Sequence, residues 1–361
     1  MATGIPPRDA VDLNATVFPA GPAIVPELPQ PYLLFLGDVP NAANAKTAFG
    51  LRDWAPERCV GEYAIPGVGV TTGLPFLEPG EARARGARSM VIGVANAGGR
   101  IPENWVGALV EALENGLDLV SGMHVPLASL PAVRAAAEAT RRRLIDVRRP
   151  PPGLPTATGR KRTGRRLLTV GTDCALGKKY TALALTRALR ARGVAADFRA
   201  TGQTGILIAG SGIPIDAVVS DFAAGAAELL SPDAAPDHWD VIEGQGSLVH
   251  PAYAAVSLAL LHGSQPDVVV VCHEPGRKTT LGLPHYPLVG IEETIDLTLR
   301  LGRRTNPAIR CAGVALNTAA LDPSAADAEL EAHSARLGLP CADPLRGGAG
   351  FERLVDACLA G

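Results

Sequence analysis

Short apolar runs alternate with amphipathic segments along the first half of the chain. Buried strands are predicted at 31–37, 58–63, 89–95 and 117–124, where each apolar run gives way to polar residues. Helical spacing covers 105–115 and ends at Gly116, a residue that commonly terminates helices. Strands that alternate with helices form a parallel α/β sheet, and the loops at the carboxyl ends of such strands carry function.

The second half of the chain repeats this pattern. An apolar strand from Leu167 is followed by a segment of helical spacing that runs to Arg192. Further strands end in polar loops within 197–205, 240–246, 267–278 and 310–317. Because the carboxyl ends of parallel strands meet at one edge of a sheet, these loops are expected to line a common pocket.

A change of composition separates the two halves. Between Arg141 and Arg166 the chain is rich in arginine and contains the triplet Pro150–Pro152. Chain of this kind resists compact packing, so we predict a linker at 151–164. The arginines could clamp an anionic cofactor, but a solvated linker and helix face is the favoured interpretation. This divides the chain into a flexible lead-in (1–30), a first domain (31–150) and a second domain (165–361).

Composition excludes several classes of protein. A length of 361 residues suits about two domains. The 34 basic and 36 acidic side chains nearly balance, which argues against a nucleic-acid binder. The six cysteines show no metal-ligand spacing, so we expect a reducing compartment and no bound metal. With neither a secretion signal nor an apolar run long enough to span a membrane, we expect a cytoplasmic protein. We also expect a homo-oligomer.

The stretch Leu167–Tyr180 has the layout of a phosphate-binding loop. It runs from a strand through a glycine-bounded turn into a helix, so main-chain N–H groups, the helix N-terminus and a lysine can together hold an anion. Five residues separate Gly171 from Gly177, one more than usual, and Lys179 stands where a Ser or Thr normally binds Mg²⁺. The predicted cofactor-binding residues are Gly171, Thr172, Asp173, Cys174, Gly177, Lys178, Lys179 and Tyr180.

Candidate catalytic and substrate-binding residues lie in the other loops. Glu243 follows a strand and precedes Gly-Gln-Gly, a loop that lets a ligand approach. Histidines titrate near neutral pH, which makes His250 and His273 candidates for proton transfer. The predicted catalytic set is Glu243, His250 and Asp173. Arginine and lysine bind carboxylates, so Arg277 and Lys278 are predicted to bind the substrate. The loop residues Gln203 and Thr204 are predicted to bind it as well.

Longer motifs resemble a known family. The loop Gly171–Lys178 and the Glu243-Gly-Gln-Gly loop are similar to those of dethiobiotin synthetase. A wider set of motifs runs from about Tyr32 to beyond Asn317 and comprises Asn44–Ala48, Gly93–Pro102, Val120–His124, Ala200–Gly205, Val219–Phe222, Glu243–Tyr253 and Cys272–Arg277. Together these motifs resemble the D-glutamate N-acetyltransferase family. In that family Met-Thr-Thr is expected after Gly-Lys, where this chain has Lys179, Tyr180 and Thr181.

The wider resemblance implies a Rossmann-like N-terminal domain joined to a P-loop C-terminal domain. It also implies transfer of an acetyl group from acetyl-CoA to the nitrogen of a small amino acid such as D-glutamate. The loop at Gly171–Lys178 would hold the CoA phosphates, and Glu243 or His250 would deprotonate the acceptor ammonium. The alternative, from the dethiobiotin synthetase resemblance, is an ATP-dependent ligase or kinase in which Asp173 and Glu243 share Mg²⁺.

Overall fold

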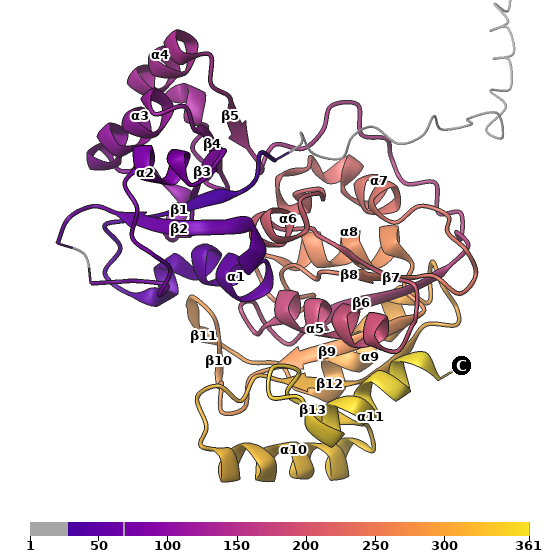
Figure 1. Cartoon of the computed structure of the whole chain (residues 1–361). Coiled ribbons are helices and arrows are strands. Elements are labelled where there is room, and N and C mark those ends of the chain that lie inside the picture. Colours follow the sequence, from indigo (N-terminus) through magenta and orange to yellow (C-terminus); the bar gives the residue numbers. More distant parts are fainter. Residues whose placement is uncertain (1–27, 68, 361) are drawn as a thin grey trace, which may run out of the picture.

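The computed structural model describes residues 28–67 and 69–360 and contains two parallel sheets (Figure 1). Most of the predicted lead-in, residues 1–27, lies outside the described residues. The first sheet has the strand order β2-β1-β3-β4-β5. Its strands are β1 (Tyr32–Gly37), β2 (Cys59–Ala64), β3 (Ser89–Ile92), β4 (Asp118–Ser121) and β5 (Leu144–Asp146), and its helices are α1 (Lys46–Trp54), α2 (Pro79–Ala84), α3 (Val106–Glu114) and α4 (Pro131–Thr140).

The second sheet has the order β13-β12-β9-β6-β8-β7. Its strands are β6 (Arg165–Gly171), β7 (Ala196–Arg199), β8 (Trp239–Ile242), β9 (Val268–His273), β12 (Arg310–Leu316) and β13 (Cys341–Ala342). Its helices are α5 (Lys178–Ala191), α6 (Gln203–Ala209), α7 (Ser220–Leu230), α8 (Ala254–Ser264), α9 (Ile291–Gly302), α10 (Pro323–Leu337) and α11 (Gly348–Leu359). The prediction of two parallel α/β sheets, Rossmann-like and then P-loop-like, is confirmed.

The second sheet is buried on both faces, which explains why its central strands are continuously apolar. Successive side chains of a strand point to opposite faces. Val268 and Val270 therefore join the cluster formed with α5 and α11, whereas Val269 joins the cluster formed with α7 and α8. Each such side chain contributes about 1.5–3 kcal/mol relative to exposure in water.

Some elements were not predicted. Strands β5 and β13 are too short to give a periodic signal, and so is the antiparallel hairpin of β10 (Thr279–Thr280) and β11 (Leu283–Pro287). The residues from Gln203, expected as loop, begin helix α6. No helix in the described ranges is long and apolar enough to cross a membrane.

Helix α6 belongs in sequence to the second domain but packs into the core of the first. Its side chains Ile206, Leu207 and Ile208 are buried in the cluster that contains the strands of the first sheet. Beside them, the hydroxyls of Thr47 in α1 and Thr204 in α6 lie 2.9 Å apart. Figure 1 shows α6 between the two lobes, next to α1. The two domains are therefore firmly packed against each other.

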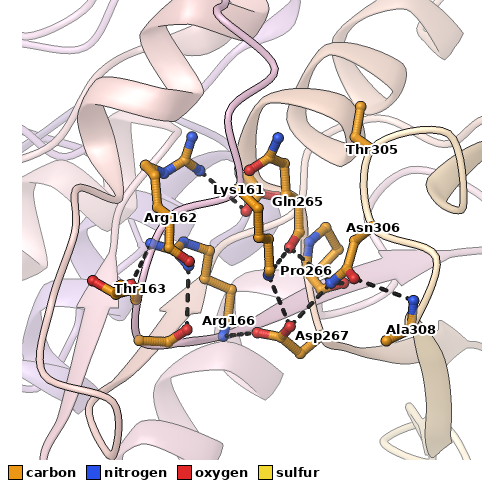
Figure 2. Close-up of polar contacts among 12 residues, drawn as sticks. Lys161, Arg162, Thr163, Arg166, Gln265, Pro266, Asp267, Thr305, Asn306 and Ala308 are labelled. Carbon is orange, nitrogen blue, oxygen red and sulfur yellow. Dashed lines mark hydrogen bonds and ion pairs between the residues drawn. The ribbon is translucent and has the colours of Figure 1, made fainter.

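The residues that precede β6 are fastened to the second domain (Figure 2). Lys161 pairs with Asp267 at 2.8 Å, and Arg162 donates to the carbonyls of Gly263 and Ser264. Arg166 is buried and donates to the Ser231 hydroxyl and several main-chain carbonyls. The expectation of solvated arginines is wrong for Arg162 and Arg166, because each guanidinium satisfies carbonyls that would otherwise be buried without partners.

We expect Arg166→Met to lower the free energy of unfolding by about 3 kcal/mol or more, because it removes the donor to the buried Ser231 hydroxyl and the buried Arg162 carbonyl. Arg165→Met is the matched control. Arg165 is exposed on the same strand, with its guanidinium 6.0 Å from the Trp239 ring, so its loss is expected to cost less than about 1 kcal/mol. Urea unfolding of both variants measures the difference, and equal midpoints would show that the buried network adds little.

Candidate functional site

A cavity of about 800 Å³ lies between the two domains. Strand β6 has β9 on one side and β8 on the other, so the loop after β6 lies where the strand order reverses, the usual ligand position in such sheets. One part of the lining is polar and includes Lys178, Lys179 and Glu243. Another part is apolar and includes Val218, Val256 and Leu281. The volume is typical of sites for sizeable small molecules.

The loop between β6 and α5 brings most of the predicted phosphate-binding residues to this cavity. Residues 174–180 all line it. Gly177, directly before the helix, has a φ of 102°, a left-handed conformation that glycine adopts without strain. Gly171 and Thr172 are absent from the lining residues. The Thr172 hydroxyl lies 3.0 Å from His273 Nδ1, and the Thr172 N–H donates to the Cys272 carbonyl.

Two adjacent lysines place positive charge at the start of α5. The buried Lys178 ammonium donates to the main-chain carbonyl of Asp173 at 2.7 Å. Burial lowers the pKa of Lys178, since no carboxylate in the described structure pairs with its ammonium. Lys179 lies over the Tyr180 ring at 4.2 Å, and burial lowers its pKa to about 8. An anion bound here would stabilise both charges.

Glu243 follows β8 and lies against the start of α6. Its Oε2 accepts hydrogen bonds from the N–H groups of Thr201 at 2.9 Å and Gly202 at 3.1 Å. Burial raises the pKa of Glu243, whereas the Lys179 charge and these two hydrogen bonds lower it. No donor in the described structure reaches Oε1. A carboxylate with a raised pKa and a free oxygen at a cavity can act as a general base.

Asp173 organises the phosphate-binding loop from inside. Its side chain is fully buried, and Oδ2 accepts from Arg277 at 2.9 Å and from the Leu281 N–H at 2.8 Å. Oδ1 accepts from the Cys174 N–H. Arg277 also pairs with Glu274. These contacts occupy both Asp173 and Arg277, and the structure brings neither to the cavity lining.

Neither of the two candidate histidines is among the residues that line the cavity. His250 is buried, its Nδ1 accepts from the Ala252 N–H at 3.0 Å, and its Nε2 lies 3.3 Å from the Leu281 carbonyl. This pattern puts the proton on Nε2 and leaves no lone pair for a substrate. Burial lowers the pKa of His273 to about 4. The geometry therefore favours Glu243 over His250 as the proton acceptor.

The predicted substrate-binding residues separate into two groups. Gln203 and Thr204, at the start of α6, line the cavity. Lys278 is exposed beside the β10–β11 hairpin and is absent from the lining. Tyr180 lines the cavity and also stacks on Trp54 of α1, with ring centroids 6.1 Å apart, so it joins the two domains.

Sequence reasoning gave no role to three charged or titratable residues that line the cavity, Lys46 and His124 from the first domain and Asp216 from the second. Arg148 also lines it and belongs to the arginine-rich stretch for which a clamp on an anionic cofactor was the less favoured interpretation. Arg148 Nη2 pairs with Asp216 at 2.6 Å across the domain boundary. The position of Lys46 at the start of the helix that follows the first strand was a usable signal, but the Arg148–Asp216 pair depends on how the domains pack.

The comparisons with known proteins cover both domains. Residues 57–150 match the model described as domain of unknown function DUF1611_N, a Rossmann-like domain. Residues 155–355 match domain of unknown function DUF1611_C, a P-loop domain. A DUF1611 family protein of Anabaena variabilis ATCC 29413, known from its crystal structure, is 34% identical. It superposes with a TM-score of 0.83, covering 91% of this chain and 99% of that one.

Two curated relatives are more similar in sequence. A D-glutamate N-acetyltransferase of Tritonibacter scottomollicae is 52% identical over 330 residues, which span 91% of this chain and 98% of the relative. A D-glutamate N-acetyltransferase of a Pseudoalteromonas species is 46% identical over 322 residues, which span 89% and 97%. The resemblance found in the motifs is thereby confirmed: the chain belongs to the DUF1611 family, alongside proteins named D-glutamate N-acetyltransferase.

Proposed function

We propose that this protein transfers an acetyl group from acetyl-CoA to the amino group of a small amino acid, with D-glutamate as the acceptor. The supporting observation is that one cavity combines the phosphate-binding loop with the buried carboxylate of Glu243. The names of the two curated relatives support the reaction and the acceptor.

The residues present suit acetyl-CoA. Gly177, Lys178 and the N-terminus of α5 would hold phosphate groups, and the apolar part of the cavity would receive the less polar arm of CoA. Lys179 supplies a cation where many phosphate-binding loops place the Mg²⁺ ligand, so phosphate binding here does not require a metal. Acetyl-CoA contributes an acetyl group activated as a thioester, together with a thiol that leaves.

Glu243 would prepare the acceptor. An amino acid at neutral pH carries an ammonium group, which has no lone pair and cannot attack a carbonyl carbon. Transfer of one proton from that ammonium to Glu243 leaves the free amine that forms the new C–N bond. Thr201 and Gly202 hold Oε2 in place, so Oε1 is the oxygen available to accept the proton.

The charge of Lys179 is expected to set the pH at which Glu243 works. In the wild-type enzyme kcat/KM should fall as the pH drops through the raised pKa of Glu243. Lys179→Met removes a charge that lowers this pKa, so the acidic limb should move to higher pH. Lys179→Arg keeps the charge and should leave the limb near its wild-type position. A pH–rate profile unchanged in Lys179→Met would contradict this electrostatic coupling.

A cytoplasmic location belongs to the same proposal. All six cysteines lie in the described ranges and are free thiols. Free cysteines in this number suit a reducing compartment.

The direct test is isothermal titration of the protein with acetyl-CoA in EDTA and, separately, with ATP and Mg²⁺. Tight acetyl-CoA binding without metal, followed by thiol release with D-glutamate, is the expected result. D- and L-amino acids screened in the same thiol assay give the acceptor and its stereochemistry. Binding of Mg²⁺-ATP alone would instead favour the ligase or kinase alternative.

A further inference from the structure

The first domain presents three side chains to the cavity: Lys46, His124 and Arg148. Each follows the carboxyl end of a strand, Lys46 after β1, His124 after β4 and Arg148 after β5. Strand β1 lies between β2 and β3, so the loop before Lys46 is at the point where the strand order of the first sheet reverses. Ligands of parallel sheets bind at this position. The cavity is therefore bounded by the ligand-binding edges of both sheets.

The charges that line the cavity are only partly compensated. Among the described residues, the lining contains four cations, Lys46, Arg148, Lys178 and Lys179, and two anions, Asp216 and Glu243. Arg148 pairs with Asp216, and the charges of Lys179 and Glu243 stabilise each other. In the described structure no carboxylate pairs with Lys46 or Lys178. One uncompensated cation thus remains in each domain.

Lys46 lies within electrostatic reach of Lys179, whose charge also interacts with the candidate proton acceptor Glu243. Gly50 lies one helical turn after Lys46, on the same side of α1. A Cβ atom added at Gly50 would lie 3.6 Å from Lys179 Nζ, so this side of α1 faces the Lys179 ammonium. Lys46 lowers the pKa of Lys179 and Glu243 raises it, so Lys179 lies within electrostatic reach of both. An anion at Lys46 would therefore lie in the cavity that Glu243 also lines.

We propose that Lys46 binds a carboxylate of the acceptor amino acid, so that the first domain holds the acceptor and the phosphate-binding loop holds the donor. This inference rests on the proposed function. It assigns the two uncompensated cations to two different anions, Lys178 to the phosphates of acetyl-CoA and Lys46 to the acceptor. It also replaces Lys278, which lies outside the cavity, as the lysine that recognises the substrate.

The test compares Lys46→Met, which removes the charge, with Lys46→Arg, which keeps it. For Lys46→Met the KM for D-glutamate should rise about tenfold to a hundredfold, as expected for a lost charged hydrogen bond. The kcat should change much less, and the Kd for acetyl-CoA, measured by titration calorimetry, should stay at the wild-type value. Lys46→Arg should recover most of the loss. Arg85→Met, an exposed cation that does not line the cavity, is the matched control.

The acceptors D-glutamate and D-norvaline, which lacks the side-chain carboxylate, identify the group that is bound. A loss confined to D-glutamate means that Lys46 binds the side-chain carboxylate, and a loss for both means the α-carboxylate. The inference would be overturned if Lys46→Met left the KM for D-glutamate unchanged, or if it raised the Kd for acetyl-CoA and not that KM. It would also be overturned if Lys278→Met raised the KM for D-glutamate and Lys46→Met did not. If the wild-type protein acetylated no amino acid, the proposed function itself would be overturned. That result needs no variant, so it is distinguishable from a failure of the Lys46 inference.

Discussion

Glu243→Gln is expected to lower kcat by about a hundredfold to ten-thousandfold, the range for loss of a general base. The amide oxygen of glutamine can still accept the N–H groups of Thr201 and Gly202, so the loop after β8 should keep its shape. An amide cannot take the proton of the acceptor ammonium. The substitution therefore removes the chemistry and leaves the surrounding geometry in place.

Single-turnover measurement of acetyl transfer, combined with calorimetric titration of acetyl-CoA, separates these two effects. The Kd for acetyl-CoA should remain within about twofold of wild type, because Gln and Glu fill the same space. The acidic limb of the pH–rate profile should also disappear, since Gln does not titrate. A variant with wild-type kcat would remove Glu243 from the mechanism. His250→Gln, which replaces a ring held by main-chain groups, tests the alternative proton acceptor in the same assay.

Lys178→Met is expected to weaken acetyl-CoA binding by about a hundredfold, the upper part of the range for a charged hydrogen bond. The Lys178 ammonium is buried at the start of α5, and its hydrogen-bond partner in the described structure is the Asp173 carbonyl. A bound phosphate would add the missing negative charge next to the N-terminus of the helix.

Calorimetric titration of acetyl-CoA measures this loss. Thermal unfolding of the same variant is the control. Methionine fills similar space and avoids the cost of a buried ammonium, and this offsets the loss of the donor to the Asp173 carbonyl, so the melting temperature should change little. Equal acetyl-CoA affinity in the two proteins would mean that the phosphates bind elsewhere. A large fall in melting temperature would instead assign Lys178 a structural role.

The features that sequence predicted well are local. The apolar run, glycine spacing and following helix of Leu167–Tyr180 specify a phosphate-binding loop because all of its parts are consecutive in the chain. Glu243 was likewise indicated by its place after a strand and before two glycines. Short elements such as β13 were missed because two residues carry no period.

The features that sequence did not predict depend on contacts between distant residues. Asp173 and Arg277 looked like ligand-binding groups, but they pair with each other across 104 positions. His250 was a reasonable candidate base from sequence, but in the fold its two ring nitrogens contact the main chain at Ala252 and Leu281. Arg166 looked solvated for the same reason, because the Ser231 hydroxyl and the Pro232 carbonyl, to which it donates, are brought to it only by folding.

The packing of α6 has a further consequence for how this chain can be divided. Ile206, Leu207 and Ile208 complete the core of the first domain although they follow the linker in sequence. A fragment that ended in the linker would expose the apolar face that these residues cover, and it would also lack Gln203 and Thr204. The first domain is therefore not a portable module: a chimera that exchanges it for a relative's must carry α6 with it, and the exchange point belongs after Ala209 rather than in the linker.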